Sequence, residues 1–284
     1  MLGLILSMIL WGTLGLFVLW SGMAAVDVAF YRCLIGALVM GCWMIKSKEK
    51  IEIDKNFPVV ALAGICLVLN WIFLFKSFQV SSITIGNMSY YLQPVILIIL
   101  GIFFYNEKVS FKQWIFILLA LCGVLLTMDL HQLNSPNVVL GATFALFAAL
   151  LYSFVTLLMK RVNLSYFKVI FIQLSIGMLI LLPFVHFQPL SLVAIVCLVV
   201  IGTVHTLLAY FLYYGAIKKT DLTKVAILSY LDPIVAIASD ILFFNRQLDV
   251  YQIIGIFLTF GALYLLVMMP RSSMQIRVVE SISA

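Results

Sequence analysis

The chain has 284 residues, of which 65% are hydrophobic and only 10% are charged. Soluble domains carry about 25% charged residues, so the composition excludes a soluble globular protein and predicts an integral membrane protein. The net charge of +6 does not indicate nucleic acid, because the lysines and arginines gather in the short connections between apolar stretches.

A helix needs about 20 predominantly apolar residues to cross the hydrocarbon core. We therefore expect an all-α integral membrane protein with ten transmembrane helices at 2–20, 26–45, 58–79, 83–105, 112–129, 138–158, 166–185, 190–216, 222–244 and 250–269. Residues 271–284 are expected to form a cytoplasmic tail.

The connections differ strongly in charge. If the ten stretches alternate across the membrane, one side receives fourteen lysines and arginines, and the other receives only Lys76 and Arg246. Positive residues favour the cytoplasmic side. The sequence thus predicts a multi-pass plasma-membrane protein with both termini in the cytoplasm. Asp27 and Lys76, near the ends of their helices, are expected to be solvated at the interface.

One motif occurs twice. Tyr91-Leu92-Gln93-Pro94 in the fourth stretch returns as Tyr230-Leu231-Asp232-Pro233 in the ninth. Matching positions in two halves indicate an internal repeat, here 1–130 and 138–270. Because five is an odd number of crossings, the second half is expected to be inverted relative to the first, with a binding site between the halves at mid-depth.

The repeated prolines predict two helix breaks. Proline has no backbone N–H, so Pro94 and Pro233 leave the carbonyls of Tyr90 and Ser229 without their helical partners. Hydrocarbon tolerates such a group only where protein or water satisfies it. We therefore favour two broken helices that face a central pocket; the alternative is a pair of packing kinks.

Asp232 is the most informative intramembrane residue, because ionisable groups at this depth are usually functional. It is a candidate substrate contact and proton-coupling site; the alternative is a carboxyl group that braces the helix break. Ser229, Asp232 and Asp240 share one helix stripe, which can line the pocket. The position that corresponds to Asp232 in the first half is Gln93.

Several further polar and aromatic residues lie in the central stretches. Arg32 is a candidate ligand for an anionic group; the alternatives are a structural ion pair and a side chain that reaches the interface. Asn70 is a candidate substrate contact or an interhelical hydrogen-bonding group. Aromatic candidates for a pocket that binds an amphipathic or cationic solute, as opposed to ordinary packing, are Trp71, Tyr90, Tyr91, Tyr210 and Tyr230.

Taken together, Trp11-Gly12, Arg32, the two Tyr-Leu-X-Pro segments and Asn106-Glu107 resemble the EamA-type transporters of the drug/metabolite transporter superfamily. The resemblance implies a five-plus-five helix fold and the transport of small metabolites, more often outward. It also implies a gating role for Glu107, which on physical grounds alone is a solvated charge at a helix end. The family often carries a second acid after the ninth helix, where this chain has Arg246.

The leading hypothesis is a secondary active exporter of small metabolites, such as amino acids or related amphipathic or cationic solutes. Alternating access would occur around the central pocket, with proton coupling at Asp232. An uptake carrier of the same fold is the alternative. A membrane-embedded enzyme and a non-transporting scaffold are rival hypotheses from other functional classes.

No cofactor or metal is expected, since the five cysteines lack paired ligand spacing. The expected partners are a small solute and the bilayer, and the sequence leaves monomer and homodimer open.

Overall fold

The structure is a computed structural model that describes residues 1–48, 56–81, 83–126, 137–244 and 249–268. These residues form helices and connections, with no β-strand among them. The elements are α1 (Leu2–Ser21), α2 (Ala25–Ser47), α3 (Phe57–Val80), α4 (Ile83–Tyr90), α5 (Gln93–Tyr105), α6 (Phe111–Leu126), α7 (Val138–Arg161), α8 (Tyr166–Leu181), the short η2 (Leu182–Phe184), α9 (Leu192–Val200), the π-helix η3 (Ile201–Leu208), α10 (Ala209–Ile217), α11 (Leu222–Leu228), α12 (Leu231–Phe244) and α13 (Val250–Met268).

Within the described residues, seven helical stretches are long and apolar enough to cross a membrane, and three shorter apolar helices accompany them. The shorter ones are Gln93–Tyr105, Phe111–Leu126 and Val250–Leu265. Each of the ten predicted ranges contains helix, and the prediction of an all-α membrane fold is confirmed. The number of ten crossings stays a prediction, because α5 and α6 are shorter than the usual span of about 20 residues.

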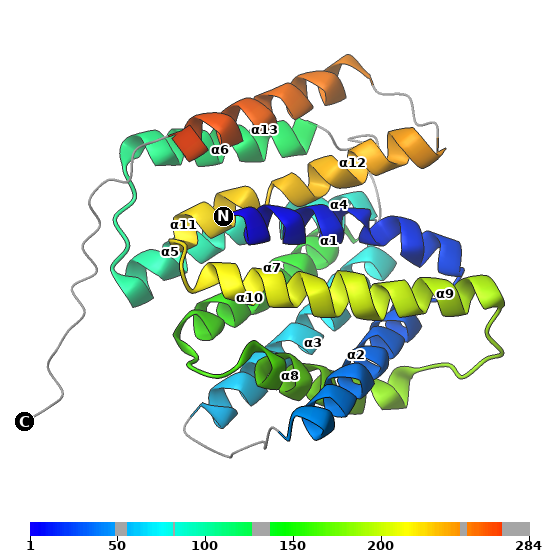
Figure 1. Cartoon of the computed structure of the whole chain (residues 1–284). Helices are drawn as coiled ribbons and strands as arrows, with labels where there is room; N and C mark the ends of the chain where they lie inside the picture. Colours follow the sequence, from blue (N-terminus) through cyan, green and yellow to red (C-terminus); the bar gives the residue numbers. More distant parts are fainter. Residues whose placement is uncertain (49–55, 82, 127–136, 245–248, 269–284) are drawn as a thin grey trace, which may run out of the picture.

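The helices of the two halves interleave. Helices from corresponding stretches pack together: α2 against α8, α5 of the fourth stretch against α11 of the ninth, and α6 against α13. Another pair of large contacts also matches across the two halves. α3 packs on α7, and in the same way α1 packs on α9 and α10. Figure 1 shows α6 and α13 side by side along one flank of the molecule. An inverted repeat would produce this exchange symmetry; the repeat itself stays a prediction.

Two helices begin with the same reciprocal hydrogen bonds. Before α6, Ser110 N donates to Gln113 Oε1 (2.7 Å) and Gln113 N donates to Ser110 Oγ (3.3 Å). Before α13, Asp249 N donates to Gln252 Oε1 (3.2 Å) and Gln252 N donates to Asp249 Oδ1 (2.8 Å). Each is a capping box, which satisfies N–H groups at a helix start. This explains why glutamine occurs at matching positions in the two halves.

Both Tyr-Leu-X-Pro segments interrupt a helix. Tyr91 and Leu92 separate α4 from α5, and Ser229 and Tyr230 separate α11 from α12. The two breaks meet, because Tyr230 Oη donates to the main-chain oxygen of Tyr91 at 3.2 Å. Pro233 has no N–H group to donate to the carbonyl of Ser229. That carbonyl accepts a hydrogen bond from Asp232 N instead, at 3.3 Å.

A third irregularity was not predicted from the sequence. Between α9 and α10 the chain forms a π-helix, Ile201–Leu208. Its wide turns are stabilised by side chains: Thr206 Oγ1 donates to Ile201 O at 2.8 Å, and His205 Nδ1 lies 3.4 Å from Val200 O. Such π-turns are rare and often mark functional sites.

We call the end of the bundle that holds the α5–α6, α7–α8 and α10–α11 connections the cationic end. Contacts join these connections: Lys160 Nζ donates to Thr220 O (2.8 Å), and Lys218 Nζ donates to Leu164 O (3.4 Å). The end with the α1–α2 and α8–α9 connections is the opposite end. By the charge rule the cationic end is predicted to be cytoplasmic.

The expected solvation of Asp27 is wrong. Its residue is only 1% exposed, and its Oδ1 accepts a hydrogen bond from His186 N at 2.9 Å. The imidazole of His186 is exposed on the surface, and its Nδ1 lies 3.6 Å from the same oxygen. The connection that follows η2 therefore covers the first turn of α2, a contact between residues far apart in the sequence.

Gly12 allows α1 to approach α12 closely. A β-carbon at this position would lie 2.6 Å from Val235 Cβ and 2.7 Å from the main-chain oxygen of Asp232. Gly15, one turn further along α1, has open space where its β-carbon would lie. The absence of a side chain at Gly12 therefore fixes the distance between α1 and the Asp232 segment.

We predict that Gly12→Val destabilises the fold, because the backbone of α12 must move to admit the side chain. Overpacking costs about 1–3 kcal/mol, so the thermal unfolding temperature in detergent should fall clearly below that of the wild type. Gly15→Val is the matched control on the same helix and should have little effect. Equal unfolding temperatures for the two variants would contradict the close α1–α12 contact.

Candidate substrate site

The principal candidate is a cavity of about 230 Å³ at the centre of the bundle. Its walls come from α1, α2, α3, α7 and α10 and from the two interrupted helices. Nine of the ten residues predicted to bind substrate line it: Arg32, Asn70, Trp71, Tyr90, Tyr91, Gln93, Tyr210, Ser229 and Asp232. Pro94 lines it as well.

Tyr230 is the predicted residue that does not line the cavity. It is fully buried, and its hydroxyl group holds the break in the first half through the main-chain oxygen of Tyr91. Pro233 also lies off the cavity wall, in the first turn of α12. The side chain of Asp240 lies outside the described residues.

Arg32 points inward and does not reach the interface. The residue is 8% exposed, Nε donates to Thr206 Oγ1 at 3.1 Å, and Cζ lies 4.5 Å from the centre of the Trp71 ring. These contacts orient the guanidinium without neutralising it. Among the described residues, no carboxylate lies within ion-pair distance of Arg32.

Asp232 lies in the first turn of α12, where the helix dipole favours a negative charge. In the described part of the chain, its carboxylate has no hydrogen-bond or ion-pair partner. The matching Gln93 differs, because Nε2 donates to Ser153 Oγ at 3.3 Å and Ser153 Oγ donates to the main-chain oxygen of Gln93 at 3.2 Å. The two halves thus place an engaged amide and a free carboxylate on the same cavity.

Asn70 makes the interhelical hydrogen bond that its sequence position suggested, and it also lines the cavity. Nδ2 donates to Ala148 O at 2.7 Å, which ties α3 to α7, and to Tyr90 Oη at 3.2 Å, which orients a ring on the cavity wall. The side chain is almost fully buried. Asn70 therefore holds the cavity's shape while it lines part of the wall.

Aromatic rings continue from the cavity toward the cationic end. The Trp11 ring lies 5.3 Å from Tyr210 and 5.0 Å from Tyr213, and its Nε1 donates to His205 O at 3.0 Å. Tyr213 and the neighbouring Tyr214 are both buried. Cavity residues that we did not predict are Met8, Trp11, Leu14, Leu74, Phe75 and Tyr152. The Trp11-Gly12 motif was a usable signal for Trp11, whereas Tyr152 stands in no distinctive pattern.

A second cavity of about 100 Å³ adjoins the first toward the opposite end. The two share Leu14, Arg32 and Phe75. The remaining walls are apolar and come from the facing ends of α1 and α2. Arg32 therefore lies between the central cavity and a smaller apolar one.

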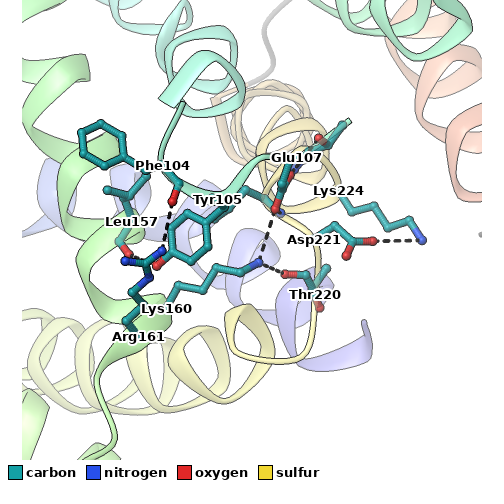
Figure 2. Close-up of polar contacts among 11 residues, drawn as sticks. Phe104, Tyr105, Glu107, Leu157, Lys160, Arg161, Thr220, Asp221 and Lys224 are labelled. Carbon is teal, nitrogen blue, oxygen red and sulfur yellow. Dashed lines mark hydrogen bonds and ion pairs between the residues drawn. The ribbon is translucent and has the colours of Figure 1, made fainter. Parts of the chain in front are cut away.

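Glu107 lies apart from these cavities, at the cationic end. The residue is 8% exposed, so the interpretation of a solvated helix-end charge is wrong. Figure 2 shows its carboxylate facing the start of α11 and the Lys160 side chain. Oε1 accepts from Leu222 N at 2.8 Å, Oε2 accepts from Thr223 N and Thr223 Oγ1 at 3.1 Å each, and Lys160 Nζ is 3.5 Å from Oε1.

Comparison with known proteins places this architecture in a family. The model of the EamA-like transporter family matches residues 1–129 and 139–268. An uncharacterized transporter of Bacillus subtilis, YxxF, is 35% identical over 271 residues, which cover 92% of this chain and 87% of the relative. The S-adenosylmethionine uptake transporter of Rickettsia conorii is 20% identical, with coverage of 78% and 76%.

A solved crystal structure of another protein superposes with a TM-score of 0.80 at 16% identity, covering 93% of this chain and 95% of the other. That similarity concerns the fold alone. The match to the family model extends over nearly the whole chain, and the similarity to YxxF agrees with it. The chain therefore belongs to the EamA-like transporter family.

Proposed function

We propose that the protein is a secondary active transporter that exports small zwitterionic metabolites, such as amino acids, by alternating access around the central cavity. The observation that carries this proposal is the pair of opposite charges on one cavity wall, Arg32 and Asp232, neither of which has an ionic partner among the described residues. A carboxylate and an ammonium group on one solute would satisfy both charges.

The cavity walls suit the rest of such a solute. Trp71, Tyr90 and Tyr91 offer aromatic surface, which binds apolar groups and the faces of cations. Buried charges are costly unless they are paired, so the solute would supply the partner that the fold withholds. This also gives a physical reason why a solute lacking one charge would bind less well.

The topology that we propose for transport is the one expected from the sequence. Ten crossings would form two inverted five-helix repeats, 1–130 and 138–270, with the cationic end and both termini in the cytoplasm. The packing of α2 on α8 and of α6 on α13, which hold matching positions in the two halves, supports such a repeat. Rocking of one half against the other would then expose the cavity alternately at the two ends.

The proposal also covers the direction of transport and its energy source. Export rests on the family resemblance; uptake is the second candidate, and the name of the Rickettsia relative favours it. We propose proton coupling at Asp232, because its carboxylate is inside the bundle and no cation of the described residues pairs with it. An embedded enzyme or a scaffold would show no solute flux in proteoliposomes, which separates those classes from a transporter.

We predict that a ligand panel will show recognition of both charges. An apolar amino acid should raise the thermal unfolding temperature more than its methyl ester or its N-acetyl derivative, each of which lacks one charge. Charge-assisted hydrogen bonds contribute about 1.5–3 kcal/mol, which corresponds to roughly a 10–150-fold change in Kd. Arg32→Gln should remove the advantage of the amino acid over the ester.

Asp232→Asn is the reciprocal variant in this panel and should remove the advantage over the N-acetyl derivative. Unfolding temperatures without ligand show whether each variant keeps its fold. A wild type that binds the ester or the N-acetyl derivative as tightly as the amino acid would contradict the zwitterion proposal.

For coupling, we predict that Asp232→Asn abolishes the response of solute flux to an imposed pH gradient in proteoliposomes, because the amide cannot carry the proton. Solute exchange at equal pH should persist once the solute concentration is raised to offset the weaker binding by this variant. Asp221→Asn is the control, since Asp221 pairs with Lys224 at 3.7 Å at the cationic end. An unchanged pH response in Asp232→Asn would remove this residue from the coupling step.

A further inference from the structure

The smaller cavity, of about 100 Å³, differs from the central one in the chemistry of its walls. In the part of the chain that the structure describes, its wall has a single polar residue, Arg32. The apolar lining residues are Leu14, Val18, Ala25, Val28, Ala29 and Phe75. An apolar hollow offers few partners to water, so a hydrocarbon group from a bound solute would fill it without displacing well-bound water.

The hollow follows from the spacing of small residues on α2. Ala25, Ala29 and Arg32 lie at intervals of four and three residues, which places them on one face of the helix. Two alanines on this face leave space that longer side chains would fill. Leu14 and Val18, four residues apart on α1, also line the hollow. The sequences of these two helices therefore create the smaller cavity directly beside Arg32.

Arg32 is fixed where the two cavities meet. Leu14, Arg32 and Phe75 line both cavities. The Nε of Arg32 donates to Thr206 Oγ1 at 3.1 Å, and its guanidinium lies over the Trp71 ring. Nη1 and Nη2 make no hydrogen bond to another described residue, so both can donate to a solute carboxylate at this junction.

A carboxylate bound at the junction also places the side chain of an amino acid there, because the side chain branches from the carbon next to the carboxylate. The ammonium group would lie in the central cavity with Asp232. The central cavity also carries amide side chains such as Asn70 and Gln93, whereas the smaller cavity is apolar apart from Arg32. Burial of a hydrocarbon chain is more favourable in the apolar space.

The volume of the smaller cavity limits the side chain that it can hold. About 100 Å³ corresponds to roughly three molecules of liquid water at about 30 Å³ each, and a methyl or methylene group has a similar size. Three or four carbon atoms therefore fill the space. A cavity of about 150 Å³ holds a benzene ring, so an aromatic side chain is too large.

We propose that the smaller cavity is a subsite for the side chain of the transported amino acid, and that it selects aliphatic chains of three or four carbons, as in valine and leucine. The proposal rests on the proposed transport function and deepens it, because it names the substrate class. Glycine and alanine would leave the subsite empty, and an aromatic amino acid would exceed its volume.

Titration calorimetry of the wild type in detergent gives the first test. We expect the Kd of leucine to be about 50-fold lower than that of alanine, because three further carbons are buried. Phenylalanine should bind less tightly than leucine. Equal affinities for leucine and alanine, or a preference for phenylalanine over leucine, would overturn the proposal.

Ala25→Leu tests the position of the subsite. The substitution adds three carbons, or roughly 90 Å³, at a residue that lines the smaller cavity. We expect the Kd of leucine to rise nearly to that of alanine, while the Kd of alanine stays the same. Ala24→Leu is the matched control at an exposed neighbouring residue and should keep the preference for leucine. A preference that survives Ala25→Leu, or an equal loss for both amino acids, would contradict the subsite.

Val28→Ala changes the same cavity in the opposite direction. It removes two carbons from the wall and enlarges the space to roughly 150 Å³, the volume that accommodates an aromatic ring. The Kd of phenylalanine should fall roughly tenfold. Unfolding temperatures without ligand show whether each variant keeps its fold, and each of the two variants tests the subsite independently. An unchanged affinity of folded Val28→Ala for phenylalanine would overturn the assignment.

The leucine methyl ester and N-acetyl-leucine separate this inference from the proposed function. If both bind the wild type as tightly as leucine, the result counts against the zwitterion transporter and against the subsite that depends on it. If leucine needs both of its charges but Ala25→Leu and Val28→Ala leave the order of the amino acids unchanged, the proposed function stands and the subsite is rejected.

Discussion

The structure depends on the requirement that every backbone polar group inside a membrane finds a hydrogen-bond partner within the protein. Unbroken helices meet this requirement by themselves, but the two segments with Pro94 and Pro233 do not. The fold brings both breaks to the centre, where Tyr230 Oη donates to the Tyr91 carbonyl and Asp232 N donates to the Ser229 carbonyl. The central cavity lies where the breaks meet because irregular backbone can be satisfied there.

The same requirement governs the buried charges. Glu107 and Lys160 are paired, and both have further hydrogen bonds, as a structural ion pair inside a protein needs: N–H and O–H groups donate to the carboxylate, and the ammonium group donates to Thr220 O. Arg32 is held in position by Thr206 and Trp71, whereas the carboxylate of Asp232 makes no such contact, and neither charge is paired within the described residues. The contrast separates two uses of charge in one bundle: the paired charges join helices, and the unpaired ones face a space that a solute can fill.

Much of this arrangement could be predicted from the sequence, because it depends on local pattern. The apolar stretches predicted the helices, and proline predicted the two interruptions. Rare polar residues such as Arg32, Asn70 and Asp232 predicted the cavity wall, since intramembrane polar groups seldom face lipid.

What the sequence did not predict depends on contacts between distant residues. Asp27 and Glu107 lie at helix ends, where solvation is the normal expectation, and both are buried by partners more than 100 positions away: His186 for Asp27 and Leu222 for Glu107. Tyr152 reaches the cavity because of how α7 is rotated in the bundle. No local pattern encodes that rotation, which only the packing of the whole bundle determines.

The π-helix of Ile201–Leu208 has a consequence for how the eighth stretch presents its side chains. A π-turn holds more residues than an α-turn, so it advances the helical phase of everything that follows. Thr206 and Tyr210 face the interior after this shift, toward Arg32 and the cavity. Removal of a single residue from this segment would restore α-helical phase and rotate the rings of α10 by about 100°, the turn per residue of an α-helix. The length of this stretch, as much as its composition, therefore sets which side chains meet the solute.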